Sequence, residues 1–172
     1  MQAILRANVP FTLKWTQPRA LRSEYELHAG SELVGLLKFR SSFGTLATGQ
    51  MADGTWTFKR VGFWRQALTI RAAGSDTDLT TFHNNTWSAG GWLELPDGRR
   101  VLATNNTWQT RYEWSLETGK VLFRFKMGGV FRQRADVEVL AAGAAMPELS
   151  MLLLVSWYLA VMLARESAAA GA

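Results

Sequence analysis

The chain has 172 residues, a net charge of +5 and 48% hydrophobic residues, which are typical of one folded domain and exclude a disordered or fibrous chain. It contains no cysteine and two histidines, so disulfides, iron–sulfur clusters, thiolate zinc sites and cysteine nucleophiles are excluded, and histidine-centred catalysis has few candidates. Residues 1–10 lack the long apolar core and cleavage site of a secretory signal. We therefore expect a cytoplasmic protein in which residues 1–10 form an N-terminal extension.

Residues 11 to 140 consist of short runs in which apolar and polar side chains alternate. Val137 and Val139, for example, alternate with Asp136 and Glu138, and triplets that contain glycine or aspartate, as at 96–98, separate the runs. This period of two is typical of strands joined by hairpin turns. The pattern predicts twelve strands near Phe11–Thr16, Glu24–His28, Leu33–Phe39, Gly44–Gln50, Thr55–Arg60, Ala67–Arg71, Leu79–His83, Gly91–Leu95, Arg99–Ala103, Thr110–Ser115, Lys120–Lys126 and Arg134–Leu140.

The C-terminal segment has a different character. Residues 149–164 are apolar on every side, apart from two serines, and predict a helix over Pro147–Arg165. Proline suits the first helical position, while Glu148 and Arg165 complement the two ends of the helix dipole. Residues 167–172 are expected to form a flexible tail.

A helix without a polar face must be buried all round, either in a bilayer or inside the protein. The apolar stretch is about 24 Å long, whereas the hydrocarbon core of a bilayer is about 30 Å thick. A closed barrel of about twelve strands is wide enough to hold a helix, because eight strands leave room only for side chains. We therefore favour an all-β fold, a roughly twelve-stranded closed antiparallel barrel that encloses a central hydrophobic helix. A C-terminally membrane-anchored β-domain is the alternative.

This order of elements resembles the tubby C-terminal-like superfamily, which includes tubby proteins, phospholipid scramblases and LURP-one-related proteins. The hairpin from Gly44–Ala47 to Gly54–Arg60 is also similar to small bacterial LURP-one-related members. The resemblance implies a single domain over residues 11–166, in which the closing helix threads the barrel. It also implies a non-enzymatic module, since tubby proteins bind phosphoinositides and scramblases have membrane-linked roles. No binding motif of these families can be placed on this sequence.

No catalytic motif, phosphate-binding glycine loop or metal-ligand spacing is present, so we expect no enzymatic activity, no cofactor and no metal. Basic side chains on strand faces and loops are the best candidates for a binding site. If the strands on either side of Gly128 pair with each other as a meander, four of these side chains would cluster, namely Arg124, Lys126, Arg132 and Arg134. The candidate residues are Arg124, Lys126, Arg132, Arg134, Lys59, Arg60, Arg65, Arg99 and Arg100.

These cations would bind an anionic membrane surface or a phosphoinositide-like ligand, which would place the protein peripherally at the inner membrane surface. A solvated barrel face with no ligand is the alternative interpretation. Phe63 and Trp64, beside Arg65, would either insert at a membrane interface or plug one end of the barrel. Acidic residues interrupt the basic segments, so a nucleic-acid partner is not expected.

Overall fold

The computed structural model describes residues 9–20, 22–62, 67–84, 90–106, 108, 110–129 and 132–171. Twelve strands and two helices occupy this part of the chain. The strands are β1 (Phe11–Thr16), β2 (Glu24–Ala29), β3 (Glu32–Phe39), β4 (Ala47–Met51), β5 (Gly54–Val61), β6 (Ala67–Ala72), β7 (Thr80–Asn84), β8 (Gly90–Glu94), β9 (Arg100–Asn105), β10 (Arg111–Leu116), β11 (Val121–Gly128) and β12 (Arg134–Val139), and the helices are α2 (Ala141–Ala144) and α3 (Leu149–Ala170). Every predicted strand is present, with ends within three residues of those expected from the alternation.

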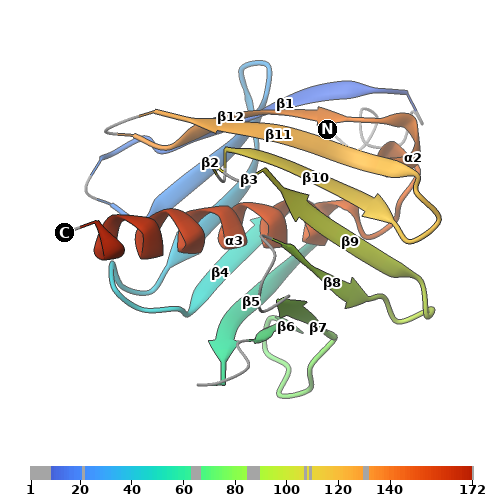
Figure 1. Ribbon diagram of the computed structural model, residues 1–172, viewed down its shortest axis with the longest axis horizontal. Helices are drawn as coiled ribbons and strands as arrows, with labels where there is room; N and C mark the ends of the chain where they lie inside the picture. Colours follow the sequence, from blue (N-terminus) through green and yellow to red (C-terminus); the bar gives the residue numbers. More distant parts are fainter. Residues whose placement is uncertain are drawn as a thin grey trace.

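The strands form one closed antiparallel barrel in which each strand pairs with its neighbours in the chain and β1 closes the ring against β12 (Figure 1). The closing register runs from Phe11 opposite Val139 to Thr16 opposite Arg134. Inward-facing apolar residues alternate with outward polar ones, as in β12, where Ala135 is buried beside the exposed Arg134. The predicted fold class is therefore confirmed.

Helix α3 lies inside the barrel and fills its lumen (Figure 1). Every residue from Leu149 to Met162 is buried. Trp157 stacks on Trp15 of β1 with ring centroids 5.3 Å apart and meets the edge of Tyr25 of β2 at 5.8 Å. These contacts explain why the helix needs no polar face, because barrel side chains surround it where water would otherwise be.

Among the described residues, α3 is long and apolar enough to cross a membrane, yet 78% of its most apolar stretch is buried inside the barrel. A membrane anchor would require α3 to leave the lumen and expose the inner faces of the strands. The packing therefore favours the enclosed helix of the two environments that its composition permits.

Gly49 of β4 allows α3 to approach the sheet closely. A Cβ atom at this position would lie 2.7 Å from the Phe58 ring and 2.9 Å from Leu154 of α3. Both neighbours are fully buried, so neither side chain has free space to move into. A glycine is required here for lack of space and not for backbone conformation.

The C-terminal helix is present but differs from the predicted range Pro147–Arg165 at both ends. The chain first forms the short helix α2, which the sequence pattern did not predict because four residues of alanine and glycine have no apolar period. Pro147 and Glu148 then lie in a turn, and α3 begins at Leu149. The helix continues past Arg165 to Ala170, because glutamate and alanine favour helix and no breaker occurs before Gly171.

The strand connections fall into two sets at opposite ends of the barrel. We call the end at which α3 begins the entry end; it contains α2 and the connections β2–β3, β4–β5, β6–β7, β8–β9 and β10–β11. We call the end at which α3 terminates the exit end; it contains the connections β1–β2, β3–β4, β5–β6, β7–β8, β9–β10 and β11–β12. In Figure 1 the C-terminal end of α3 lies at the left, with the β3–β4 connection below it and the β1–β2 connection above it.

Candidate functional site

Within the described residues, no group of three or more His, Asp or Glu side chains is placed to hold a metal ion. The basic side chains predicted from the sequence are the other candidates for a binding site. These side chains differ in whether they already form an ion pair with a carboxylate. This difference decides which of them is available to a ligand.

At the entry end, Arg99 is held by two carboxylates. Its Nε donates to Asp97 Oδ2 at 2.5 Å, and its Nη2 donates to Glu148 Oε1 at 3.0 Å. The backbone N–H of Arg99 also donates to Asp97 Oδ1, and these hydrogen bonds lower the pKa of the Asp97 carboxyl. Because Glu148 immediately precedes α3, Arg99 links the β8–β9 turn to the start of the helix.

Arg100 of β9 is occupied in a similar way. Its Nε lies 3.3 Å from Glu94 Oε2, its Nη1 lies 3.9 Å from Glu117 Oε1, and its guanidinium sits 4.9 Å from the centre of the Trp92 ring. Two of the predicted binding residues, Arg99 and Arg100, thus lie at the entry end in ion pairs.

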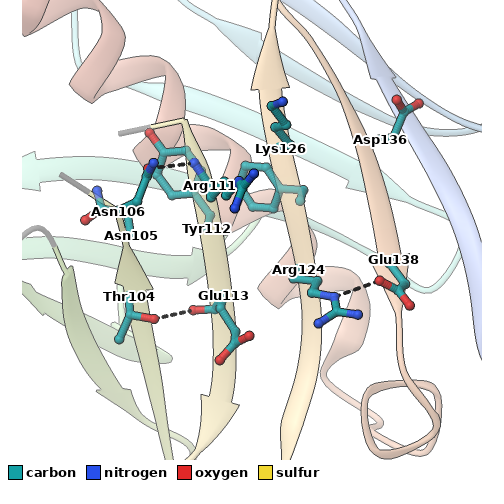
Figure 2. Close-up of a pocket in the computed structure, with 11 residues that line it drawn as sticks. Thr104, Asn105, Asn106, Arg111, Tyr112, Glu113, Arg124, Lys126, Asp136 and Glu138 are labelled. Atoms are coloured by element: carbon teal, nitrogen blue, oxygen red, sulfur yellow. Dashed lines mark hydrogen bonds and ion pairs between the residues drawn. The ribbon is translucent and has the colours of Figure 1, made fainter. Parts of the chain in front are cut away.

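A shallow groove of about 710 Å³ crosses the outer face of β9 to β12 (Figure 2). Its lining contains three cations and three carboxylates, so the groove has no net charge. Arg124 lies opposite Glu113 of β10 and Glu138 of β12, and its Nε donates to Glu138 Oε2 at 2.7 Å. This hydrogen bond lowers the pKa of Glu138. The charged lining residues are Arg111, Glu113, Arg124, Lys126, Asp136 and Glu138.

The predicted meander around Gly128 is confirmed by the register of β11 and β12. Lys126 lies opposite Asp136, and Arg134 lies opposite Gly128. The hairpin therefore brings Lys126, Arg132 and Arg134 toward the exit end, where all three are exposed. Arg124 stays further along the barrel in its ion pair with Glu138.

Arg19 and Arg22, which are not among the candidates predicted from the sequence, lie on the β1–β2 connection beside this hairpin. Gln17 holds the two segments together. Its backbone N–H donates to Gln133 O at 3.0 Å, its Oε1 accepts from Gln133 N at 3.0 Å, and its Nε2 donates to Arg22 O at 2.8 Å. Gln133 lies between Arg132 and Arg134 in the chain, so the Gln17 bonds bring the basic residues of both segments close together.

The β3–β4 connection adds Arg40 to this end. The Phe39 N–H donates to Ser23 O at 2.9 Å, which joins the end of β3 to the β1–β2 connection. We call Arg19, Arg22, Arg40, Arg132 and Arg134 the basic rim. All five side chains are exposed, and within the described residues none of them forms an ion pair with a carboxylate.

The pKa of Glu24, at the start of β2, is lowered by Lys38 and by two arginines of the basic rim. Lys38 donates a hydrogen bond to its carboxylate at 2.9 Å and lowers its pKa, and the positive charges of Lys38, Arg22 and Arg19 lower it further. Glu24 is thus already paired with Lys38, which leaves the arginines of the basic rim without a carboxylate of their own.

Side chains of α3 fix the β3–β4 connection from inside. Tyr158 Oη donates to Thr45 O at 2.5 Å, and Arg165 Nη1 donates to Gly44 O at 3.3 Å. The Arg165 guanidinium also lies 4.1 Å from the centre of the Phe39 ring. The connection is therefore anchored to the core of the barrel.

The remaining predicted residues lie on β5 and just beyond it. Arg60 forms an ion pair with Glu166 of α3, so it holds the helix end. Lys59 is exposed on the outer face of β5, opposite Thr69. Arg65, with Phe63 and Trp64, lies outside the described residues.

Comparison with known proteins adds to the description of the fold. No family model matches the chain, and no curated protein matches its sequence. The structure is similar to the X-ray structure of AT5G01750, a LURP-one-related protein from Arabidopsis thaliana, with a TM-score of 0.55 over 88% of this chain and 90% of that chain. The sequences are 10% identical, so the likeness shows a shared fold and assigns no residue a role.

Proposed function

We propose that this protein is a LURP-one-related member of the tubby C-terminal-like superfamily and works as a non-catalytic module that binds anionic phosphoryl groups through the basic rim. The shared fold supports the family, and the distribution of ion pairs supports the binding role. We place the protein in the cytoplasm, at the inner membrane surface when bound.

One observation supports this function above the others. Arg99 and Arg100 at the entry end are paired with carboxylates, whereas the arginines of the basic rim lie on joined connections and form no ion pair within the described residues. Guanidinium groups bind phosphate oxygens through paired charge-assisted hydrogen bonds, and each basic residue near an anionic surface contributes about 1 kcal/mol. Hydrogen bonds between the connections reduce the ordering that binding would require.

The test compares one arginine of the basic rim with a matched lysine of the entry end. Arg134→Glu and Lys120→Glu each lower the net charge by two, and within the described residues neither parent side chain forms an ion pair. The probes are inositol trisphosphate and vesicles of phosphatidylcholine with one-fifth phosphatidylserine, each titrated at low and high salt.

We expect binding to both probes, weakened by salt, with an affinity about tenfold lower for Arg134→Glu and changed by less than about twofold for Lys120→Glu. Equal losses from both variants would show that only net charge matters. No binding of either probe at low salt would contradict the proposed function.

A further inference from the structure

Phe43, on the β3–β4 connection, is fully exposed at the exit end. An exposed phenylalanine on a loose loop would need no explanation. This connection, however, is ordered on both sides of the ring. Gly44 N donates to Ser41 Oγ at 2.9 Å, Arg40 N donates to Leu46 O at 2.9 Å, and α3 bonds Gly44 and Thr45. The chain thus holds a large apolar side chain in water at a defined position.

This position lies at the same end of the barrel as the basic rim. The β3–β4 connection lies below the end of α3 in Figure 1, and the bond from the Phe39 N–H to Ser23 O joins the end of β3 to the β1–β2 connection. Arg40 is three residues from Phe43, Arg19 and Arg22 lie on the β1–β2 connection, and Arg132 and Arg134 lie on the β11–β12 hairpin. Cations and an exposed aromatic ring therefore share one end of the molecule.

These two features together select a bilayer surface over a free phosphorylated molecule. A soluble phosphoryl ligand would use the arginines and leave Phe43 in water. A membrane interface provides phosphates for the arginines and, a few ångströms deeper, an apolar layer for the ring. A cluster of cations and one apolar side chain each bind a membrane weakly, but together they are sufficient for reversible membrane binding.

We infer that the protein docks on anionic bilayers with its exit end, the basic rim contacting headgroups while Phe43 enters the interface. This inference rests on the proposed function, of which it specifies the ligand source and the orientation. The entry end then faces away from the membrane. Substitution of Phe43 weakens vesicle binding but leaves the affinity for inositol trisphosphate unchanged.

The experiment uses the absence of cysteine from the chain, which allows a fluorophore to be attached at one chosen position. Phe43→Cys places an environment-sensitive NBD label at the exit end, and Ser31→Cys places it on the exposed β2–β3 turn of the entry end as the matched control. Both labelled proteins are titrated with phosphatidylcholine vesicles that contain one-fifth phosphatidylserine, with and without lipids that bear a nitroxide quencher in the acyl chain.

We expect the label at position 43 to gain fluorescence and to be quenched by the acyl-chain nitroxide, while the label at position 31 changes in neither respect. In unlabelled protein, Phe43→Ser should lower vesicle affinity about tenfold, whereas Leu33→Ser, which removes an exposed apolar side chain at the entry end, should leave it unchanged. Inositol trisphosphate affinity should be the same for both variants.

The outcomes separate the two proposals. Vesicle binding without burial of the label at position 43, or with equal burial at position 31, would overturn the inferred orientation and leave the proposed function intact. Binding of inositol trisphosphate without binding of vesicles would do the same. Failure to bind either probe would overturn both.

Discussion

The two ends of this barrel share the same strands and the same helix but differ in how their cations are used. At the entry end, Arg99 and Arg100 each contact carboxylates, and one of these, Glu148, leads into α3. At the exit end, hydrogen bonds from Gln17 hold basic connections together, and no carboxylate of the described chain pairs with the basic rim. Arg99 and Arg100 therefore stabilise the entry end, whereas the arginines of the basic rim, unlike the paired Arg60 and Lys38 of the same end, are left for a ligand.

The largest predicted effect concerns the core that supports both ends. Trp157→Ala removes a fully buried ring that stacks on Trp15, and it should lower the free energy of unfolding by about 3–5 kcal/mol. The matched change Trp108→Ala removes a ring that is 82% exposed and should change stability by less than about 0.5 kcal/mol. Urea denaturation of both variants measures the difference. Similar effects would show that α3 does not fill the barrel.

The three tyrosines provide a pH test of the same core. Burial raises the pKa of Tyr112 and of Tyr158 to about 12, and it also raises the pKa of Tyr25, from an ordinary value of 10.0. A raised tyrosine pKa stabilises the fold below pH 10 and loses that contribution as the pH rises toward 12. Near-ultraviolet titration of folded protein at pH 10 should show clearly less tyrosinate than the half-ionisation expected of free tyrosine. Half-ionisation at pH 10 without unfolding would place these rings in water.

Removal of one cation from each end should separate stability from binding. Arg99→Ala leaves Asp97 and Glu148 without their partner and should lower the free energy of unfolding by up to about 1 kcal/mol, with no effect on vesicle affinity. Arg134→Ala should leave stability within about 0.5 kcal/mol and lower vesicle affinity about fivefold. Thermal unfolding and vesicle sedimentation measure the two quantities. The opposite pattern would mean that the roles of the two ends are reversed.

The smallest predicted effect on binding comes from Gln17→Ala, which removes the bond that Gln17 Oε1 accepts from Gln133 N and the bond that its Nε2 donates to Arg22 O. We expect vesicle affinity to fall about threefold, because the arginines of the basic rim are less well ordered, and stability to fall by about 0.5–1.5 kcal/mol. Gln50→Ala, an exposed position on β4, is the control and should alter neither quantity. Unchanged vesicle affinity in Gln17→Ala would show that these hydrogen bonds do not order the basic rim.

The sequence predicted the barrel and its helix because both depend on local patterns. Alternation defined the twelve strands, and a segment apolar on all sides required a lumen. The ends of α3 were missed because α2 has no apolar period and because the alanine-rich residues after Arg165 continue the helix beyond the buried part.

The candidate site was harder to predict because it depends on contacts between distant parts of the chain. Arg19 and Arg22 come near Arg132 and Arg134 because β1 closes the barrel against β12 and Gln17 bonds to Gln133. The closed barrel was predicted from the sequence, but no local pattern indicates which connections hydrogen bonds would join. The pairing of Arg124 could have been predicted, since a meander around Gly128 places Glu138 opposite it.

Hydrogen–deuterium exchange in the presence of phosphatidylserine-containing vesicles tests the difference between the two ends most directly. We expect vesicles to slow amide exchange in residues 17–20 and 40–46 of the exit end and to leave the entry-end turns at 30–31, 52–53 and 117–120 unchanged. Slower exchange at the entry-end turns, or no change at either end when the protein is bound, would contradict the assignment of the exit end as the binding surface.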